Sequence, residues 1–144
     1  MPPRATPDGR RFLVAQDLMQ GLAEKLDTEL SGVQSVTGMD LVGTRYAHPL
    51  YPRESMVLLG GDYITTDSGT GLVHTAPGHG QEDYITGLKY GLDLLSPVDN
   101  VGKFTTEAGP EFEGMSVLSD GNEAVIRALE REGALIAEEA YNHK

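Results

Sequence analysis

Cysteine is absent from the 144 residues, and positively charged residues are scarce. The lack of cysteine excludes disulfide bonds and thiolate chemistry, so stability and catalysis must come from other groups. The 22 Asp and Glu residues against 11 Lys and Arg give a formal charge of −11, which repels a polyanion such as nucleic acid. We therefore expect no DNA partner, and we expect any contact with RNA to be local.

Long apolar runs are also missing. No segment approaches the roughly 20 apolar residues of a membrane helix, and the opening MPPRATPDGRRF lacks the apolar centre of a secretory signal. Hydrophobic residues make up 39% and charged residues 23%, a composition typical of one soluble globular domain. We expect no membrane partner. The expected location is the cytoplasm, or an organelle matrix or stroma if the source is eukaryotic.

The chain is predicted to consist of a lead and one domain. Residues 1–9 hold three prolines and few apolar groups, which indicates a disordered lead or an expression remnant before a domain at 10–144. Apolar spacing predicts helices at 16–26, 81–90 and 121–132. Strands are predicted at 11–15, 31–37, 56–59, 62–66, 94–98, 102–105 and 134–140, including a hairpin around Gly60-Gly61 and an irregular connection at 39–53. Because no regular βαβ alternation appears, the expected class is α+β, with a mixed or barrel-like β-sheet and about three short helices.

Chemistry-bearing side chains gather in one glycine-rich segment, residues 69–84. They are His74, Thr75, His79, Glu82 and Asp83. Glycine lets the backbone approach a ligand closely, and an acid near a helix start can be held by free N–H groups and the helix dipole. Asp83 is therefore a candidate partner for a cation. The alternatives are that Asp83 is a helix-capping or first-turn residue without a ligand, and that His74 is a hydrogen-bonded histidine at a strand end.

A metal site is a rival interpretation of the same segment, because two histidines and a carboxylate often hold zinc or iron. The spacing of His74, His79 and Asp83 matches no tight metal motif, however, and a glycine-rich loop gives little control over two imidazoles. A phosphate-binding loop is disfavoured too, since neither GxxxxGK nor the dinucleotide fingerprint is present. We expect neither a metal nor a cofactor at this segment.

The segment GTGLVHTAPGHGQEDY, followed by GLKYGL and SPVDNVGKFT, closely resembles the editing domain inserted in isoleucyl-tRNA synthetases of the bacterial and organellar type. Further stretches resemble the same domain in order, namely RFLVAQDL, LVGTRYAHPLYPRES, EFEGMSVL and EGALIAEEAYNHK. The resemblance covers residues 10–144. Related valyl and leucyl enzymes share a similar GTG pattern but are expected to differ at His74 and around 75–80, so HTAPGHG indicates the isoleucyl branch.

This resemblance implies editing, both of the charged tRNA and of its activated precursor. Isoleucyl-tRNA synthetase is itself the standard example of the problem: a pocket gains only about 1–3 kcal/mol from the methylene that valine lacks, so a second site must hydrolyse valyl-tRNA(Ile) while excluding isoleucine. By resemblance, Asp83 is the catalytic-site anchor of the substrate's α-ammonium group, and His74 excludes the larger side chain. Gly71 and Thr75 are further substrate-binding residues. A positioned water, rather than a protein nucleophile, is expected to attack the ester.

One expected part of the family's site is missing. The family also uses a threonine-rich peptide of the kind TTTPWTLP, and Thr65-Thr66 lack the Pro-Trp that follows it. ATP-binding signatures and an anticodon-recognising region are absent as well, so ATP and Mg²⁺ would belong to the synthetase body. We therefore expect an editing domain without its N-terminal threonine-rich segment, partnered by tRNA(Ile) carrying valine and by the parent synthetase in cis. The alternative is a folded fragment without stand-alone catalysis, acting as a structural or binding module.

Overall fold

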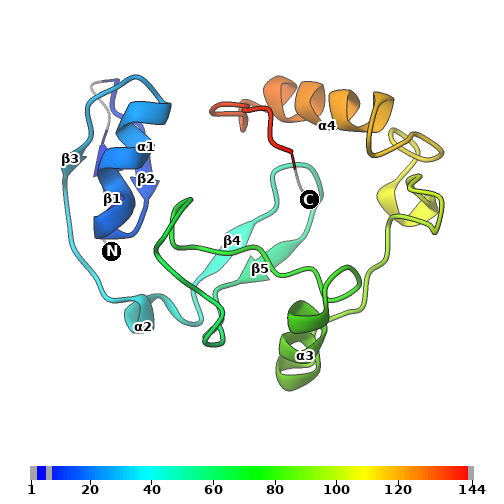
Figure 1. The fold of residues 1–144 in the computed structure, drawn as a ribbon, viewed down its shortest axis with the longest axis horizontal. Helices are drawn as coiled ribbons and strands as arrows, with labels where there is room; N and C mark the ends of the chain where they lie inside the picture. Colours follow the sequence, from blue (N-terminus) through cyan, green and yellow to red (C-terminus); the bar gives the residue numbers. More distant parts are fainter. Residues whose placement is uncertain (1–2, 6–7, 143–144) are drawn as a thin grey trace. The chain divides into compact units, whose positions relative to one another are not determined.

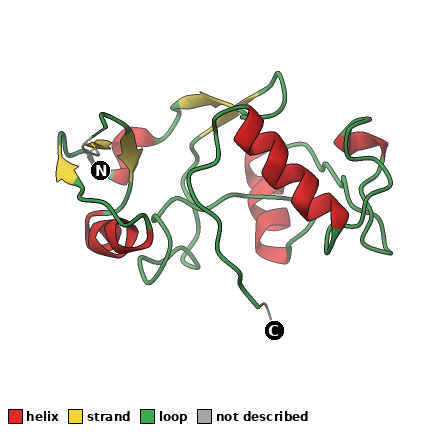
Figure 2. Ribbon diagram, turned by 90° about the horizontal axis from the view of Figure 1, so that it is seen from above, coloured by secondary structure: helices red, strands yellow, loops and turns green. Residues whose placement is uncertain are grey.

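The computed structural model describes residues 3–5 and 8–142, and the chain divides into two compact units (Figure 1). The first unit consists of Met1–Ala47 and Arg53–His74. The second consists of His48–Pro52 and Thr75–Lys144. Short helices alternate with long loops in both units, and the named strands of the described residues all lie in the first unit (Figure 2).

A small antiparallel sheet opens the first unit, in the strand order β2-β1-β3. Strand β1 (Pro3–Ala5) pairs with β2 (Arg11–Leu13) and with β3 (Ser31–Gly32). Strand β1 lies inside the predicted lead at 1–9, because backbone pairing uses no apolar side chain and leaves little trace in composition. Residues 1–2 and 6–7 of that lead lie outside the described residues.

The predicted helix at 16–26 is confirmed. It consists of the 3₁₀ turn η1 (Gln16–Leu18) and of α1 (Met19–Lys25). A shorter helix, α2 (Gly38–Leu41), was not predicted. It begins with a capping box, in which the Thr37 hydroxyl accepts from the Asp40 N–H and the Asp40 carboxylate accepts from the Thr37 N–H.

The second antiparallel sheet of this unit pairs β4 (Arg45–Ala47) with β5 (Glu54–Met56). The hairpin predicted around Gly60-Gly61 is wrong. Beyond β5, Val57 donates to Thr44 O at 2.9 Å and accepts from the Gly43 N–H at 2.9 Å, so this strand pairs with the preceding segment. Residues 39–53, expected to be irregular, therefore supply β4.

The core of the second unit is formed by Ala108, Phe112 and Ala128, each at most 5% exposed. Partly buried side chains surround them, namely Leu50, Tyr51, Phe104, Ala124 and Val125. Ala128 lies on α4 (Asp120–Arg131), which confirms the amphipathic helix predicted at 121–132. Ala108 ends the 3₁₀ turn η2 (Thr106–Ala108). The α+β class is confirmed, although the described strands form two separate antiparallel sheets because the strand pairings stay local in sequence.

Two of the predicted strand regions differ in the second unit. In place of the strands at 94–98 and 102–105, the described residues form two isolated bridges, between Val98 and Phe104 and between Lys103 and Ser116. The Asp99 carboxylate accepts from the Val101 and Lys103 N–H groups at 2.9 Å, which makes a turn rather than a long hairpin. Residues 134–140 are irregular throughout, so the predicted closing strand is wrong.

Tyr51 ties a distant segment of the sequence to this core. Its hydroxyl donates to the buried carbonyl oxygen of Ala108 at 2.6 Å. We predict that Tyr51→Phe lowers the free energy of unfolding by about 1 kcal/mol, because the carbonyl loses its partner while the ring stays in place. Urea denaturation measures this change. Tyr141→Phe, at an 84% exposed position, is the matched control, and an equal effect of both variants contradicts the prediction.

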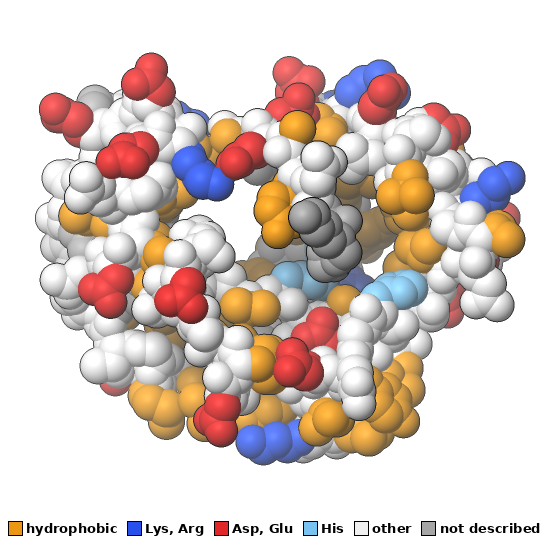
Figure 3. All heavy atoms as spheres, viewed as in Figure 1, with side chains coloured by type: hydrophobic (Ala, Val, Ile, Leu, Met, Phe, Trp, Pro, Cys, Tyr) orange, Lys and Arg blue, Asp and Glu red, His pale blue; other side chains and the backbone are white. Residues whose placement is uncertain are grey.

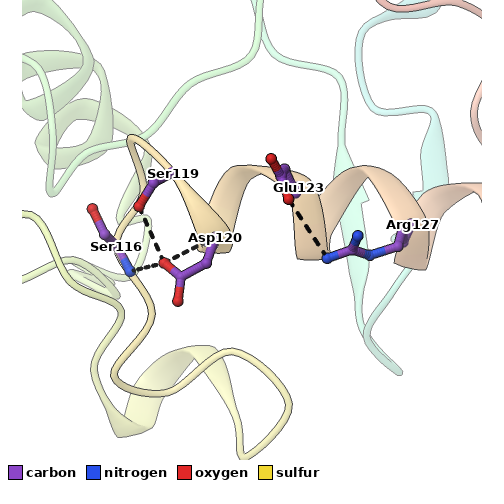
Figure 4. Close-up of polar contacts among 6 residues, drawn as sticks. Ser116, Ser119, Asp120, Glu123 and Arg127 are labelled. Carbon is purple, nitrogen blue, oxygen red and sulfur yellow. Dashed lines mark hydrogen bonds and ion pairs between the residues drawn. The ribbon is translucent and has the colours of Figure 1, made fainter.

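Two carboxylates of the second unit, Asp120 and Glu111, make the free energy of unfolding depend on pH in the acidic range. The Asp120 carboxylate accepts from the Ser116 N–H at 2.9 Å and from the Ser119 hydroxyl (Figure 4), and the Ser116 bond is the main reason that the pKa of Asp120 is lowered. The two hydrogen bonds from Arg131 likewise lower the pKa of Glu111.

A lowered pKa in the folded state stabilises the protein above the ordinary values, which are 3.8 for Asp and 4.5 for Glu. That stabilisation is lost as the pH falls through the folded-state pKa. We predict that Asp120→Asn lowers the urea midpoint at about pH 6, and that the difference is smaller at about pH 3, below the ordinary Asp value of 3.8. A difference that is the same at both pH values contradicts the assignment.

Candidate functional site

The candidate site is built on α3 (Gln81–Tyr90), which has the predicted bounds. Gly91 ends the helix in the left-handed conformation, with φ of 65°. Asp83 lies in the first turn of the helix and is half-buried. The helix start therefore places a carboxylate close to free backbone N–H groups, where the helix dipole favours negative charge.

The Asp83 side chain reaches back to the glycine-rich loop. Its Oδ2 accepts from the Ala76 N–H at 3.1 Å. The N-cap residue is Gly80, and no side chain caps this helix, so Asp83 is not a capping residue but a first-turn residue, which is the other form of the alternative interpretation. Among the described residues no other group bonds to Asp83. One carboxylate oxygen is thus fixed by the loop, and the other is available to a donor from a ligand.

The loop at 75–80 packs closely on Gly87 of α3 and on Leu95, which follows the helix. A Cβ atom at Gly87 would lie 2.8 Å from Pro77 Cβ, and one at Gly78 would collide with the Leu95 carbonyl oxygen. The His79 N–H donates to Ala76 O at 2.9 Å and closes a turn within the loop. Glycine at 78 and 87 is therefore required for the packing that sets the position of Ala76 relative to Asp83.

We predict that Gly87→Ala disturbs this site. The added methyl group forces Pro77 to move, which costs about 1–3 kcal/mol of stability and displaces Ala76 from Asp83. In a two-dimensional NMR spectrum, the Ala76 amide proton should shift upfield as its hydrogen bond lengthens. Gly21→Ala, at a position inside α1 where a Cβ would meet no neighbour and φ is not positive, is the control for a general effect of replacing glycine. An unshifted Ala76 amide in Gly87→Ala contradicts the packing argument.

The remaining predicted site residues are divided between the two units. Thr75 is half-buried and precedes Ala76 in the second unit, whereas Gly71 and the exposed His74 belong to the first. Gly71 has φ of 81°. It follows Thr70, whose carbonyl oxygen accepts from the Ala15 N–H at 2.7 Å. The structure thus brings Asp83 together with the loop that begins at Thr75, and it anchors the residues before Gly71 to the first unit.

Sequence reasoning missed the supporting contacts of Pro77, Gly87 and Leu95. A signal for one of them was present, since a glycine inside a helix costs about 1 kcal/mol relative to alanine and indicates a packing requirement. His79 is exposed. In the described part of the chain, no three His, Asp or Glu side chains are grouped so that they could hold a metal ion. No described helix has the length and apolar character needed to cross a membrane.

Comparison with known proteins gives several close relatives of the chain. Isoleucine–tRNA ligase of Microcystis aeruginosa is 58% identical over 139 residues, 96% of this chain and 14% of that protein. The enzyme of Gloeothece citriformis is 59% identical over 92% of this chain and 14% of its own length. The chloroplastic/mitochondrial enzyme of Arabidopsis thaliana is 58% identical over 92% of this chain and 12% of its own length. No family model matches the chain.

These relatives are all aminoacyl-tRNA ligases. More particularly, the sequence of the chain belongs with one segment of the isoleucine–tRNA ligases of the bacterial and organellar type. It spans about 14% of the length of the bacterial relatives that it matches.

Proposed function

We propose that this chain carries part of the editing site of an isoleucine–tRNA ligase, which hydrolyses valyl-tRNA(Ile) and spares isoleucyl-tRNA(Ile). The observation that carries the proposal is the Asp83 carboxylate, held by the Ala76 N–H at 3.1 Å beside a loop packed closely on α3. A fixed carboxylate with an available oxygen is the group that an α-ammonium ion requires, because the resulting hydrogen bond is charge-assisted.

Asp83 acts in this proposal as an anchor rather than as a general base. Its bond to the loop fixes the direction of the carboxylate, so the amino acid enters with its ammonium group at α3 and its ester carbonyl carbon turned away from Asp83. A water oriented by hydrogen bonds attacks that carbon, and the ribose oxygen of the terminal adenosine leaves with a proton. Holding the ester and the water in a reactive geometry supplies the rate enhancement.

By the family resemblance, selection against isoleucine is assigned to His74, and Gly71 and Thr75 are proposed as further substrate-binding residues. A planar imidazole is rigid apart from two rotatable bonds, so it can exclude one methylene without closing the pocket to valine. The resemblance of HTAPGHG to the isoleucyl family supports this role. The exposure of His74 in this chain leaves its ring accessible to a substrate.

Binding of tRNA requires more than this chain. Its formal charge is −11, and the Lys and Arg side chains on the face seen in Figure 3 are scattered singly among acidic ones. The parent synthetase would therefore supply most contacts to the phosphate backbone, as well as the ATP and Mg²⁺ used for charging. The proposed location is the cytoplasm or an organelle matrix, in keeping with the bacterial and chloroplastic/mitochondrial relatives.

Deacylation by the isolated chain tests whether it acts alone. We predict that 144 residues incubated with valyl-tRNA(Ile) release valine at least tenfold more slowly than the full-length synthetase, because the threonine-rich peptide and most tRNA contacts are missing. The readout is acid-precipitable radioactive valine on the tRNA over time, with buffer as the control for spontaneous hydrolysis. A rate equal to that of the full-length enzyme would refute the view that the chain is a folded module that depends on its parent.

A further inference from the structure

Glu107 is fixed by its backbone to the core of the second unit. It lies in the 3₁₀ turn η2, where its N–H donates to the hydroxyl of the N-cap residue Thr105 at 3.3 Å. The turn ends at Ala108, which is buried in the core and whose carbonyl oxygen accepts from the Tyr51 hydroxyl. The start of the Glu107 side chain is therefore held at a defined position.

The Glu107 carboxylate holds the segment that precedes Pro97. Its Oε2 accepts from the Ser96 N–H at 2.9 Å. The Thr105 N–H donates to Pro97 O at 2.8 Å and fixes the next part of the same segment. No other group among the described residues accepts from the Ser96 N–H. The carboxylate therefore sets the orientation of the peptide that joins Leu95 to Ser96.

This one peptide also forms the contact with the glycine-rich loop. The Leu95 carbonyl and the Ser96 N–H belong to the same planar trans peptide, so an acceptor that fixes the N–H also fixes the direction of the carbonyl. A Cβ atom at Gly78 would collide with this carbonyl oxygen and would lie 3.4 Å from Ser96 Cα. The loop thus packs on the peptide that Glu107 orients.

The turn around Gly78 carries the contact on to Asp83. The His79 N–H donates to Ala76 O at 2.9 Å and closes this turn. The N–H of the same Ala76 donates to Asp83 Oδ2 at 3.1 Å. A rotation of the Leu95 peptide therefore displaces the donor that fixes the Asp83 carboxylate.

We propose that Glu107 is a positioning residue of the editing site, which sets the direction of the Asp83 carboxylate through the Ser96 peptide and the loop at 75–80. The proposal rests on the proposed function, since the group that is positioned is the ammonium anchor of that site. A misplacement of about 1 Å by a mutation far from the chemistry can slow a reaction by about 10²-fold. The loss of one exposed hydrogen bond can therefore matter more for the rate of hydrolysis than for stability.

Single-turnover deacylation of valyl-tRNA(Ile) by the full-length synthetase tests this role. Glu107→Ala should lower the limiting rate by about 5- to 20-fold. The enzyme concentration that gives half of this rate should change by less than about twofold, because the parent enzyme supplies most tRNA contacts. Glu107→Gln keeps an acceptor for the Ser96 N–H, so its rate should stay within about twofold of the unmutated enzyme. Glu113→Ala is the matched control, since it removes an exposed carboxylate that makes no hydrogen bond among the described residues.

A double-mutant cycle separates positioning from a general loss of structure. In an Asp83→Asn background, Glu107→Ala should cause no further loss of rate, because no charge is left to direct. An equal fold-loss in both backgrounds would overturn the proposal, and so would a Glu107→Gln enzyme as slow as Glu107→Ala. Glu107→Asp, whose side chain is one methylene shorter, is the second variant if Glu107→Ala does not fold, and the same loss is expected.

The Ala76 amide proton of the 144-residue chain gives a readout that does not depend on hydrolysis. In a two-dimensional NMR spectrum it should shift upfield in Glu107→Ala and keep its position in Glu107→Gln. An unshifted Ala76 amide in Glu107→Ala would overturn the inference. If Asp83→Asn edits normally while the amide still responds to Glu107→Ala, the proposed function fails and the contacts from Glu107 to Asp83 stand.

Discussion

Replacing Asp83 with asparagine in the full-length synthetase is expected to slow hydrolysis of valyl-tRNA(Ile) by about 10²-fold or more. The physical reason is the loss of the negative charge that pairs with the α-ammonium group, since breaking a hydrogen-bonded charge pair in a site costs about 2–5 kcal/mol. Single-turnover deacylation with enzyme in excess measures the effect at the editing step. Aminoacylation with isoleucine should be unchanged, because it takes place elsewhere in the enzyme.

Asparagine is the informative replacement because it removes the negative charge of Asp83 and keeps a hydrogen-bond acceptor in its place. Its Oδ1 can still accept from the Ala76 N–H, whereas Asp83→Ala removes this acceptor together with the charge. We expect both variants to be inactive in editing, and only Asp83→Ala to disturb the loop. Asp93→Asn, at an exposed acid after the same helix, controls for the change in net charge. Full activity of Asp83→Asn would mean that the ammonium anchor lies elsewhere.

Replacing His74 with alanine is expected to remove the discrimination against isoleucine. The shortened side chain leaves room for the extra methylene, so isoleucyl-tRNA(Ile) becomes a substrate. The ratio of valyl to isoleucyl hydrolysis rates should fall by about 10- to 200-fold, the range that one methylene is worth in a pocket. Deacylation of both charged tRNAs by the variant gives this ratio.

The control for this prediction is His79→Ala, which removes an exposed imidazole from the same loop region. It should leave the ratio unchanged, since only the His79 backbone N–H takes part in the turn with Ala76. A His74→Ala enzyme that still spares isoleucyl-tRNA(Ile), while hydrolysing valyl-tRNA(Ile) normally, would assign the size selection to another residue.

The three longest helices were predictable from this sequence because their determinants are local, whereas the short helix α2 was not predicted. The helix at 81–90 is set by its apolar spacing and by Gly91, whose positive φ ends it. The strands were harder to predict, because each one depends on a pairing partner that cannot be identified from its own local sequence. Val57 pairs with Gly43 and Thr44 rather than across Gly60-Gly61, and Pro3–Ala5 enters a sheet from a proline-rich segment that local rules assign to a loop.

The candidate site was predictable only in part, for a similar reason. An acid at the start of a helix after a glycine-rich loop indicated Asp83, and the family resemblance supplied its partner. Asp83 accepts a hydrogen bond from the N–H of Ala76, seven residues earlier in the sequence. This bond depends on the tertiary packing of Pro77 on Gly87, which local sequence does not indicate. The hydrogen bond of Glu107 to the segment after α3 was equally hidden, because its two partners lie 11 residues apart in the sequence.

The most direct test of the account is the deacylation of two charged tRNAs by the full-length synthetase that contains this chain. Valyl-tRNA(Ile) and isoleucyl-tRNA(Ile) are incubated separately with the enzyme, without ATP, and the amino acid remaining on the tRNA is followed over time. The account predicts rapid loss of valine and retention of isoleucine. Hydrolysis of both at the same rate, or of neither above the buffer control, would contradict it.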